Sequence, residues 1–259
     1  MNQSAMIQVR ALCHTYERWG LRTSALRDVR LDVRGGEWVA LTGANGSGKS
    51  TLLKLLAGLL PVQTGEVQIA GQPWAGMPMR RRASLVYLVH QDPMAGTAPA
   101  LTVGEHLALA APPADGSAAA KSRELQRPQA QGEFLEAMKL DVAPSQLVAT
   151  LSGGQRQLLA LLVASLRPAP VILLDEPMAA LDADRTEACA HTLRMLHSSG
   201  RTLLLVTHDV GFAQSSADRT IRLEAGCIAL DQTHTQPSVS DVTPLRQSRH
   251  PAVPATQVF

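Results

Sequence analysis

Residues 43–51 have the sequence Gly-Ala-Asn-Gly-Ser-Gly-Lys-Ser-Thr and constrain the fold more than any other stretch of this chain. They match the pattern Gly-x4-Gly-Lys-[Ser/Thr], which indicates a phosphate-binding P-loop only when a strand precedes it and a helix follows it. Residues 38–42 are apolar and favour a strand, whereas residues 52–58 favour a helix with a leucine face. The flanks therefore favour a P-loop over a glycine-rich turn that happens to contain Lys-Ser.

The residue types of this loop suit a bound polyphosphate. Its glycines lack Cβ atoms, so backbone N–H groups can approach the anion closely, and the following helix directs its positive dipole end at the same anion. We expect Lys49 to reach the β- and γ-phosphates and the Ser50 hydroxyl to bind Mg²⁺. The residues predicted to bind nucleotide here are Gly43, Ala44, Asn45, Gly46, Ser47, Gly48, Lys49, Ser50 and Thr51.

Composition adds few constraints. The chain has 259 residues, 45% of them hydrophobic and 18% charged, which fits one large globular domain or two small ones. A formal net charge of +2 does not indicate a nucleic-acid partner, and none is predicted. The three cysteines are isolated, so reduced thiols in the cytosol fit best. We find no signal peptide and no apolar run near the ~20 residues that span a bilayer, so another chain must supply any span.

Alternating apolar and polar residues predict an antiparallel sheet beside the nucleotide core. Residues 6–12, 28–34 and 65–71 alternate in this way. Tyr16 is predicted to lie in a polar loop after the first of these strands. Residues 221–230 are predicted to form a closing hairpin through a glycine turn.

Continuous apolar runs predict strands that are buried on both faces, as in a parallel sheet. These runs cover residues 85–89, 171–174 and 203–206. The polar residues that follow them are Gln91, Asp175, Glu176 and His208. Because ligands bind at the carboxyl ends of the strands in open parallel sheets, we expect these side chains to converge on the nucleotide held by the P-loop.

Residues 93–150 are predicted to form a mostly helical insertion into the α/β core. Thr102 and Glu105 have the spacing of a capping box at a helix start. Residues 112–132 are rich in Pro, Ala, Gly, Ser and Gln and are predicted to be a loose connection, after which residues 134–140 resume helical spacing.

The insertion is predicted to continue into a long helix over residues 151–167, with Ser152 as its N-cap. Asp182 lies in the loop after the apolar run 171–174 and is placed to cap the helix that follows. A single domain is predicted over residues 6–234. Residues 235–259 are rich in Pro, Ser, Thr, Gln and Val without any period, so they are predicted to be a mobile tail.

An apolar strand that ends in Asp-Glu resembles a Walker B motif. Asp175 would hold Mg²⁺ directly or through water, and Glu176 would polarise the attacking water. An isolated Asp-Glu pair is more often a solvated strand end. Behind four apolar residues, in a chain with a P-loop, the catalytic role is the better interpretation.

The order of these motifs resembles that of the ATP-binding cassette (ABC) ATPase family over about residues 6–231. The most specific element is Leu-Ser-Gly-Gly-Gln at residues 151–155, the signature of that family. The resemblance implies an α/β fold with a P-loop NTPase (RecA-like) core, an antiparallel β subdomain and an inserted α-helical subdomain. It also implies ATP and Mg²⁺ as cofactors.

The resemblance assigns roles to further residues. Tyr16 would stack on adenine, although Trp19 is close to it in sequence. Gln91 would join Mg²⁺ and the catalytic water to the helical insertion, and His208 would contact the γ-phosphate. The residues expected to meet nucleotide bound by a second subunit are the signature residues Ser152, Gly153, Gly154 and Gln155, and the D-loop residue Asp182.

The family resemblance implies a cytoplasmic protein, peripheral on the inner face of the cell membrane, that dimerises on ATP and drives a separate permease. The second cassette would be a copy of this chain or a paralogue. Residues 91–110 resemble more closely the ATPase subunits of a little-characterised bacterial importer group, whose substrate-binding proteins are sometimes linked to aromatic amino acids. Import of a small solute such as an amino acid, with an extracytoplasmic substrate-binding protein, is therefore expected.

Three alternatives remain open. The first is an exporter ATPase, and the second is a soluble ABC ATPase of DNA repair or translation. The chain has one P-loop and only about 60 residues between Gln91 and Leu151, whereas repair proteins have long coiled-coil insertions and translation proteins have two cassettes. The third is a degenerate cassette, which the intact Lys49, Glu176 and His208 argue against.

Overall fold

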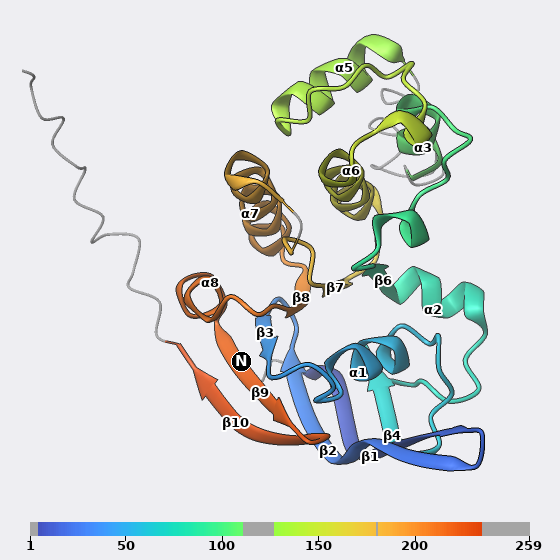
Figure 1. Cartoon of the computed structure of the whole chain (residues 1–259), viewed down its shortest axis with the longest axis vertical. Helices are drawn as coiled ribbons and strands as arrows, with labels where there is room; N and C mark the ends of the chain where they lie inside the picture. Colours follow the sequence, from blue (N-terminus) through green and yellow to red (C-terminus); the bar gives the residue numbers. More distant parts are fainter. Residues whose placement is uncertain (1–4, 111–126, 180, 235–259) are drawn as a thin grey trace, which may run out of the picture.

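The computed structural model describes residues 5–110, 127–179 and 181–234. The predicted mobile tail, 235–259, and most of the predicted connection lie outside the described residues. Within them the chain forms two sheets with helices around them, and a helical unit at one end (Figure 1). This arrangement confirms the predicted α/β class.

The central sheet has six strands in the order β10-β9-β3-β8-β7-β6. They are β3 (Trp38–Thr42), β6 (Val86–Val89), β7 (Val171–Asp175), β8 (Thr202–Val206), β9 (Arg219–Glu224) and β10 (Cys227–Thr233). All pair in parallel except β10, which returns antiparallel to β9 as the predicted hairpin. The strands β3, β7 and β8 are buried throughout, as their apolar runs predict. The prediction is wrong for β6, because it is an edge strand and its middle residues are only half-buried.

Helices cover both faces of this sheet. They are α1 (Lys49–Leu56), α2 (Met79–Leu85), α7 (Ala183–Ser198) and α8 (Val210–Ser216). Alternate residues of β3 enter different cores, since Val39 and Leu41 pack with α1, and Trp38 and Ala40 pack with α7. In the ranges that the structure describes, no helix combines the length and the apolar character required to cross a membrane.

The predicted antiparallel sheet is present and has the order β2-β1-β4-β5. Its strands are β1 (Ala5–Arg18), β2 (Leu21–Arg34), β4 (Thr64–Ile69) and β5 (Gln72–Pro73). The first two are longer than predicted, so Tyr16 lies within a strand and not in a loop. A two-residue turn joins them at Trp19 and Gly20, whose φ angles of 51° and 78° suit a tight hairpin.

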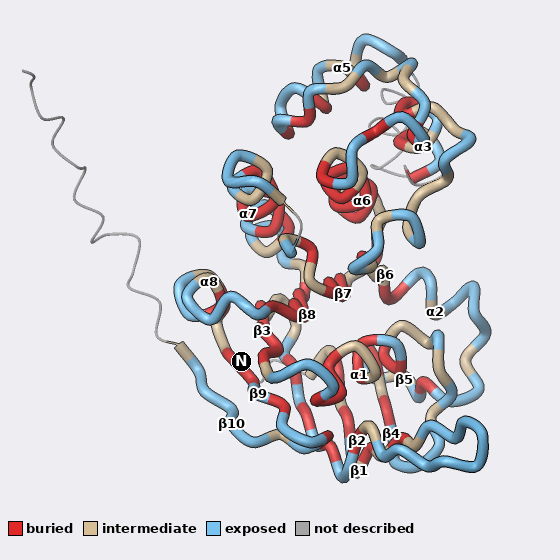
Figure 2. Tube along the Cα trace, in the orientation of Figure 1, coloured by how far each residue is buried: buried red, intermediate tan, exposed pale blue. Residues whose placement is uncertain are grey.

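The helical unit contains α3 (Val103–Ala110), α5 (Pro128–Ala137) and α6 (Gly153–Leu166). The helix α6 is buried along most of its length, whereas the outer side of α5 is exposed (Figure 2). The helix α5 begins inside the stretch predicted as a loose connection. Its first residue, Pro128, is favourable there because proline has no N–H that the first turn would leave unpaired.

Two capping boxes begin helices of this unit, one at Thr102 as predicted, and one at Ser152, which was predicted only as an N-cap. At α3, the N–H of Glu105 donates to Thr102 Oγ1 at 3.2 Å, and the N–H of Thr102 donates to Glu105 Oε2 at 2.8 Å. At α6, Ser152 and Gln155 make the same reciprocal pair at 3.2 Å and 2.9 Å. Each box satisfies backbone donors that a helix start would otherwise leave unpaired.

The first testable prediction concerns the α3 capping box. Replacing Thr102 with Ala should lower the free energy of unfolding by about 1 kcal/mol, because the N–H of Glu105 loses its acceptor. Urea denaturation followed by circular dichroism measures the change. Thr102→Ser is the matched control and should retain most of the stability, since serine is an equally good N-cap. Equal losses in both variants would contradict the capping assignment.

The same variant has an expected pH dependence. Two hydrogen bonds hold the pKa of Glu105 below its ordinary value. The larger effect comes from the backbone N–H of Thr102 and the smaller from the Thr102 hydroxyl. A lowered pKa in the folded state stabilises the protein above the unfolded pKa, and this stability is lost as the pH falls through the folded pKa. The difference between Thr102→Ala and the parent should therefore shrink below about pH 4.3, the ordinary pKa of glutamate.

Candidate functional site

The P-loop lies at the base of a cleft of about 640 Å³, a volume typical of small-molecule sites. The predicted site residues that line it are Tyr16, Asn45, Gly46, Gly48, Lys49, Ser50, Thr51, Gln91, Glu176 and His208. We call this space the P-loop cleft. Three lining residues were not predicted, Thr23, Ser24 and Ala25 of β2, because β2 begins seven residues earlier than the alternation of residues 28–34 suggested.

Two glycines of the P-loop are required by its geometry. Gly43 and Gly48 have φ angles of +137° and +107°, which L side chains rarely adopt. A Cβ at Gly43 would lie 2.2 Å from the carbonyl oxygen of Leu223, and one at Gly48 would lie 2.5 Å from that of Ala25. The loop is therefore pressed against β9 and β2, which fixes its position at the base of the cleft.

The side chain of Lys49 hydrogen-bonds to the backbone of the P-loop and stabilises its conformation. Its Nζ donates to the carbonyl oxygens of Gly43 at 2.8 Å and Ala44 at 2.9 Å. Burial lowers the pKa of Lys49, and the nearby Glu176 and Asp175 partly oppose this effect. An ammonium group has three donors, so one donor stays available for an anion in the cleft.

Ser50 and Asp175 place two oxygen ligands side by side. Asp175 ends β7, and its Oδ1 accepts a hydrogen bond from Ser50 Oγ at 3.1 Å. Burial is the main cause that raises the pKa of Asp175, and Ser50 opposes it. Within the described ranges no group of three or more His, Cys, Asp or Glu could hold a metal alone. Mg²⁺ fits this pair, since it prefers oxygen ligands and usually takes others from water and phosphates.

The carboxylate of Glu176 contacts the other two residues predicted to be catalytic, His208 and Gln91. Its Oε1 lies 2.5 Å from Nε2 of His208, and its Oε2 accepts from Nε2 of Gln91 at 3.1 Å. The side chain of Glu176 is only 13% exposed, whereas that of His208 is 46% exposed. The three side chains follow strands β7, β8 and β6, so the parallel sheet brings together residues that are far apart in sequence.

Tyr16 also lines the P-loop cleft. Its hydroxyl is 3.4 Å from Thr51 Oγ1, and its ring meets the buried His14 edge-to-face at 4.8 Å. Burial lowers the pKa of His14, which favours the neutral imidazole against the ring. Trp19 is 86% exposed and does not line the cleft, so the geometry favours Tyr16 as the aromatic residue for a base.

The signature residues are not part of the P-loop cleft. Ser152 caps α6, and Gly154 in its first turn lets Leu181 and Arg185 approach, because an added Cβ would lie 3.3 Å and 2.9 Å from their side chains. Asp182 caps α7 by accepting from the N–H of Arg185 at 2.9 Å, and it also pairs with the Arg185 guanidinium.

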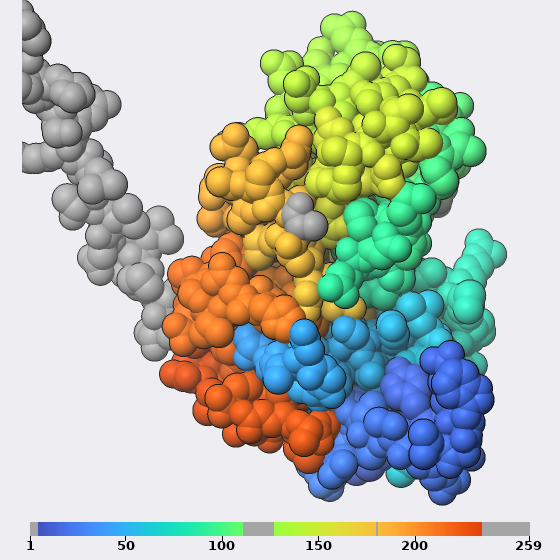
Figure 3. All heavy atoms as spheres, in the orientation of Figure 1, coloured from blue at the N-terminus to red at the C-terminus, as the bar shows by residue number. Residues whose placement is uncertain are grey.

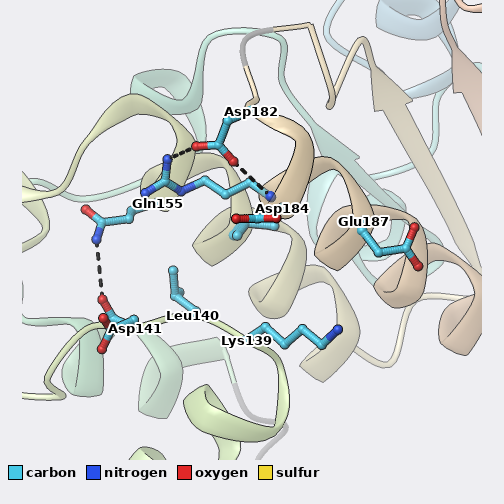
Figure 4. Close-up of a pocket in the computed structure, with 9 residues that line it drawn as sticks. Lys139, Leu140, Asp141, Gln155, Asp182, Asp184 and Glu187 are labelled. Atoms are coloured by element: carbon cyan, nitrogen blue, oxygen red, sulfur yellow. Dashed lines mark hydrogen bonds and ion pairs between the residues drawn. The ribbon is translucent and has the colours of Figure 1, made fainter. Parts of the chain in front are cut away.

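Gln155 and Asp182 instead line a second cleft of about 420 Å³ (Figure 4). We call it the acidic cleft. Its lining residues are Lys139, Leu140, Asp141, Gln155, Leu158, Asp182, Asp184, Arg185 and Glu187. Figure 4 shows Asp141 and Gln155 on one side of this cleft and Asp182 and Asp184 on the other. The fold thus keeps the signature apart from the P-loop of the same chain.

Comparison with known proteins places this geometry in a family. The ABC transporter family matches residues 26–179. A tyrosine transport ATP-binding protein of Clostridioides difficile is 34% identical over 231 residues, which cover 87% of this chain and 91% of that protein. The macrolide export ATP-binding/permease protein MacB of Pasteurella multocida is 32% identical over 256 residues, covering 96% of this chain and 38% of that protein.

A solved structure agrees with the sequence matches. The dimeric, post-hydrolysis state of the ATP-binding cassette MJ0796 bound to ADP and Pi superposes with a TM-score of 0.75 at 27% identity. The match covers 89% of this chain and 99% of that chain. The chain therefore belongs to the ABC transporter family and has the ATP-binding cassette of that family's ATPases.

Proposed function

We propose that this chain is the ATPase subunit of an importer, and that it binds ATP with Mg²⁺, closes as a dimer and drives a separate membrane permease. The observation that carries the proposal is the Glu176 carboxylate, held between Gln91 and His208 at the end of β7, beside the P-loop. A carboxylate held in this way can polarise a water molecule for attack on a phosphate.

The proposed roles use residues of the P-loop cleft and Asp175, which lies beside Ser50. Lys49 and the P-loop N–H groups bind the β- and γ-phosphates, and Tyr16 stacks on adenine. Ser50, Asp175 and Gln91 would hold Mg²⁺, which supplies positive charge against the phosphates. Glu176 orients and polarises the water, and His208 contacts the γ-phosphate.

The importer assignment rests on a relative of similar length. The tyrosine transport protein of Clostridioides difficile matches this chain over 91% of its own length, and residues 91–110 resemble an importer group. We infer a small solute such as an amino acid, a permease, and an extracytoplasmic substrate-binding protein. The chain would then lie in the cytoplasm, on the inner face of the membrane.

The second prediction tests this assignment. Affinity capture of the chain from detergent-solubilised membranes should recover a polytopic membrane protein. Uptake of labelled tyrosine by cells with the parent chain should exceed uptake by cells with Lys49→Ala, because transport needs ATP turnover. Capture without any membrane protein would contradict the transporter assignment. If Lys49→Ala reduced efflux and left uptake unchanged, the result would favour an exporter, and the relative MacB is named for export.

The third prediction concerns Lys49 itself. Lys49→Ala removes the one buried ammonium at the P-loop, and charge-assisted hydrogen bonds of this kind suggest an ATP affinity about 10- to 100-fold lower. Turnover should be lost while circular dichroism is unchanged. Lys54→Ala is the matched control, an exposed lysine on the same helix that should leave both affinity and turnover near those of the parent. Normal turnover in Lys49→Ala would refute the assigned role.

The fourth prediction concerns assembly. Because the signature lies outside the P-loop cleft of its own chain, we propose a two-fold dimer in which the signature of one copy meets ATP on the P-loop of the other. The related cassette MJ0796 is dimeric in its solved structure. ATP should close this dimer because its γ-phosphate bridges both copies, and hydrolysis should open it.

Glu176→Gln keeps the shape of the side chain but removes its charge, so it should bind ATP, turn over very slowly and accumulate as a dimer. Adding Ser152→Arg puts bulk and a cation where the γ-phosphate must dock, and should return the protein to the monomer. Size-exclusion chromatography with light scattering, with and without Mg-ATP, measures both outcomes. A Glu176→Gln protein that stays monomeric at saturating ATP with its permease present would exclude the shared site.

A further inference from the structure

The hairpin formed by β1 and β2 extends beyond the sheet to which it belongs. The strand β4 pairs with β1 only as far as Cys13, whereas β2 stays paired with β1 out to Arg18 and Leu21. The end of the hairpin is therefore a two-stranded ribbon. Tyr16 and Thr23 of this ribbon line the P-loop cleft, so its tip lies just past the site that we assign to ATP.

The tip, Arg18 to Arg22, presents apolar and cationic groups to solvent. Trp19 and Leu21 are 86% and 73% exposed. The guanidinium of Arg18 lies over the Trp19 ring at 4.3 Å, and Arg22 pairs with Glu17 at 3.3 Å in an exposed ion pair of the weak kind. Trp and Arg are the residue types enriched at the centres of protein interfaces, and neighbouring exposed apolar side chains mark such surfaces.

The acidic cleft offers the complementary charge. Four of its lining residues are carboxylates and two are cations, and one of those cations, Arg185, already pairs with Asp182. The cleft therefore has net negative charge at neutral pH. Its volume of about 420 Å³ exceeds that of a tryptophan side chain, and Leu140 and Leu158 supply an apolar lining.

Two-fold symmetry relates these two surfaces. The hairpin and the helical unit, which includes α6, lie at opposite ends of the molecule (Figures 1 and 3). In the dimer proposed above, the P-loop cleft of one copy, which Tyr16 and Thr23 of the hairpin line, faces the signature of the other copy. Because Gln155 of that signature also lines the acidic cleft, the acidic cleft of the second copy lies on the side that faces the hairpin.

We propose that, in the ATP-closed dimer, the hairpin tip of each copy docks at the acidic cleft of the other, with Trp19 as its apolar anchor and Arg18 and Arg22 facing the carboxylates. The occupant is a second copy of this chain. The inference rests on the proposed dimer and adds to it a contact beside each shared ATP site. Because the tip adjoins the ribbon that lines the P-loop cleft, docking also orders the side of the cleft formed by Tyr16.

The fifth prediction uses the fluorescence of Trp19. The chain has three tryptophans, and Trp38 and Trp74 are each 1% exposed, so acrylamide in solution quenches mainly Trp19. In the Glu176→Gln protein, Mg-ATP should lower the acrylamide quenching constant roughly twofold or more, as expected for an aromatic side chain that becomes buried in an interface. Glu176→Gln with Ser152→Arg, which binds ATP but stays monomeric, is the control and should show no protection.

Charge reversal gives a second, independent measurement. Arg18→Glu with Arg22→Glu should weaken ATP-driven dimerisation about tenfold, as should Asp184→Lys with Glu187→Lys, because each change places like charges across the contact. Combining the two pairs should restore dimerisation, since the charges are then exchanged and again complementary. Arg80→Glu with Arg81→Glu, the same charge change on exposed residues of α2, is the matched control and should have little effect.

The outcomes separate the two proposals. A Glu176→Gln protein that never dimerises would overturn the closed dimer, and the docking contact with it. A protein that dimerises while Trp19 stays fully quenchable, or while the reversed pairs fail to compensate, would overturn the docking contact alone. Protection of Trp19 by anionic lipid vesicles without nucleotide would assign the tip to a membrane surface and also overturn the contact.

Discussion

Parallel pairing of β3, β8 and β7 is the constraint on which the candidate site depends. The pairing is in register from Val39 and Leu204 to Asp175 and Val206, so the three strands end at the same edge of the sheet. Two hydrogen bonds continue it past the strand ends, from the N–H of Thr207 to Leu41 and from the N–H of Glu176 to Val206. The residues after each strand therefore meet, whatever their separation in sequence.

The fold divides the chemistry between two surfaces. The P-loop cleft contains the groups suited to phosphates, metal ion and water, whereas Gln155 of the signature and Asp182 line the acidic cleft, at the junction of α6 and α7. The family resemblance implies an ATP site that needs both surfaces, so neither surface would form a complete ATP site alone. In the dimer that we propose, association would bring the two surfaces together, and the binding of nucleotide would change the distance between the subunits.

Local signals in the sequence predicted the parts of the site that lie at strand ends and helix starts. The P-loop pattern, the apolar run before Asp175 and the N-cap at Ser152 each act over a few residues, so one sequence suffices to find them. The strand position of Tyr16 was missed because the projecting ribbon has both faces in solvent and shows no alternation. The start of α5 was missed because its composition is polar and its stability comes from packing on the rest of the helical unit.

Glu176 has a backbone φ of 50°, in the left-handed region that disfavours a side chain by about 1 to 2 kcal/mol. Its N–H bonds to Val206 and its carbonyl oxygen accepts from the N–H of Ala179, so the neighbouring loop maintains this conformation. Glycine would relax the backbone there, but it would remove the carboxylate. Laboratory evolution for heat resistance alone would therefore favour glycine at this position and yield a more stable protein without the carboxylate to which we assign catalysis.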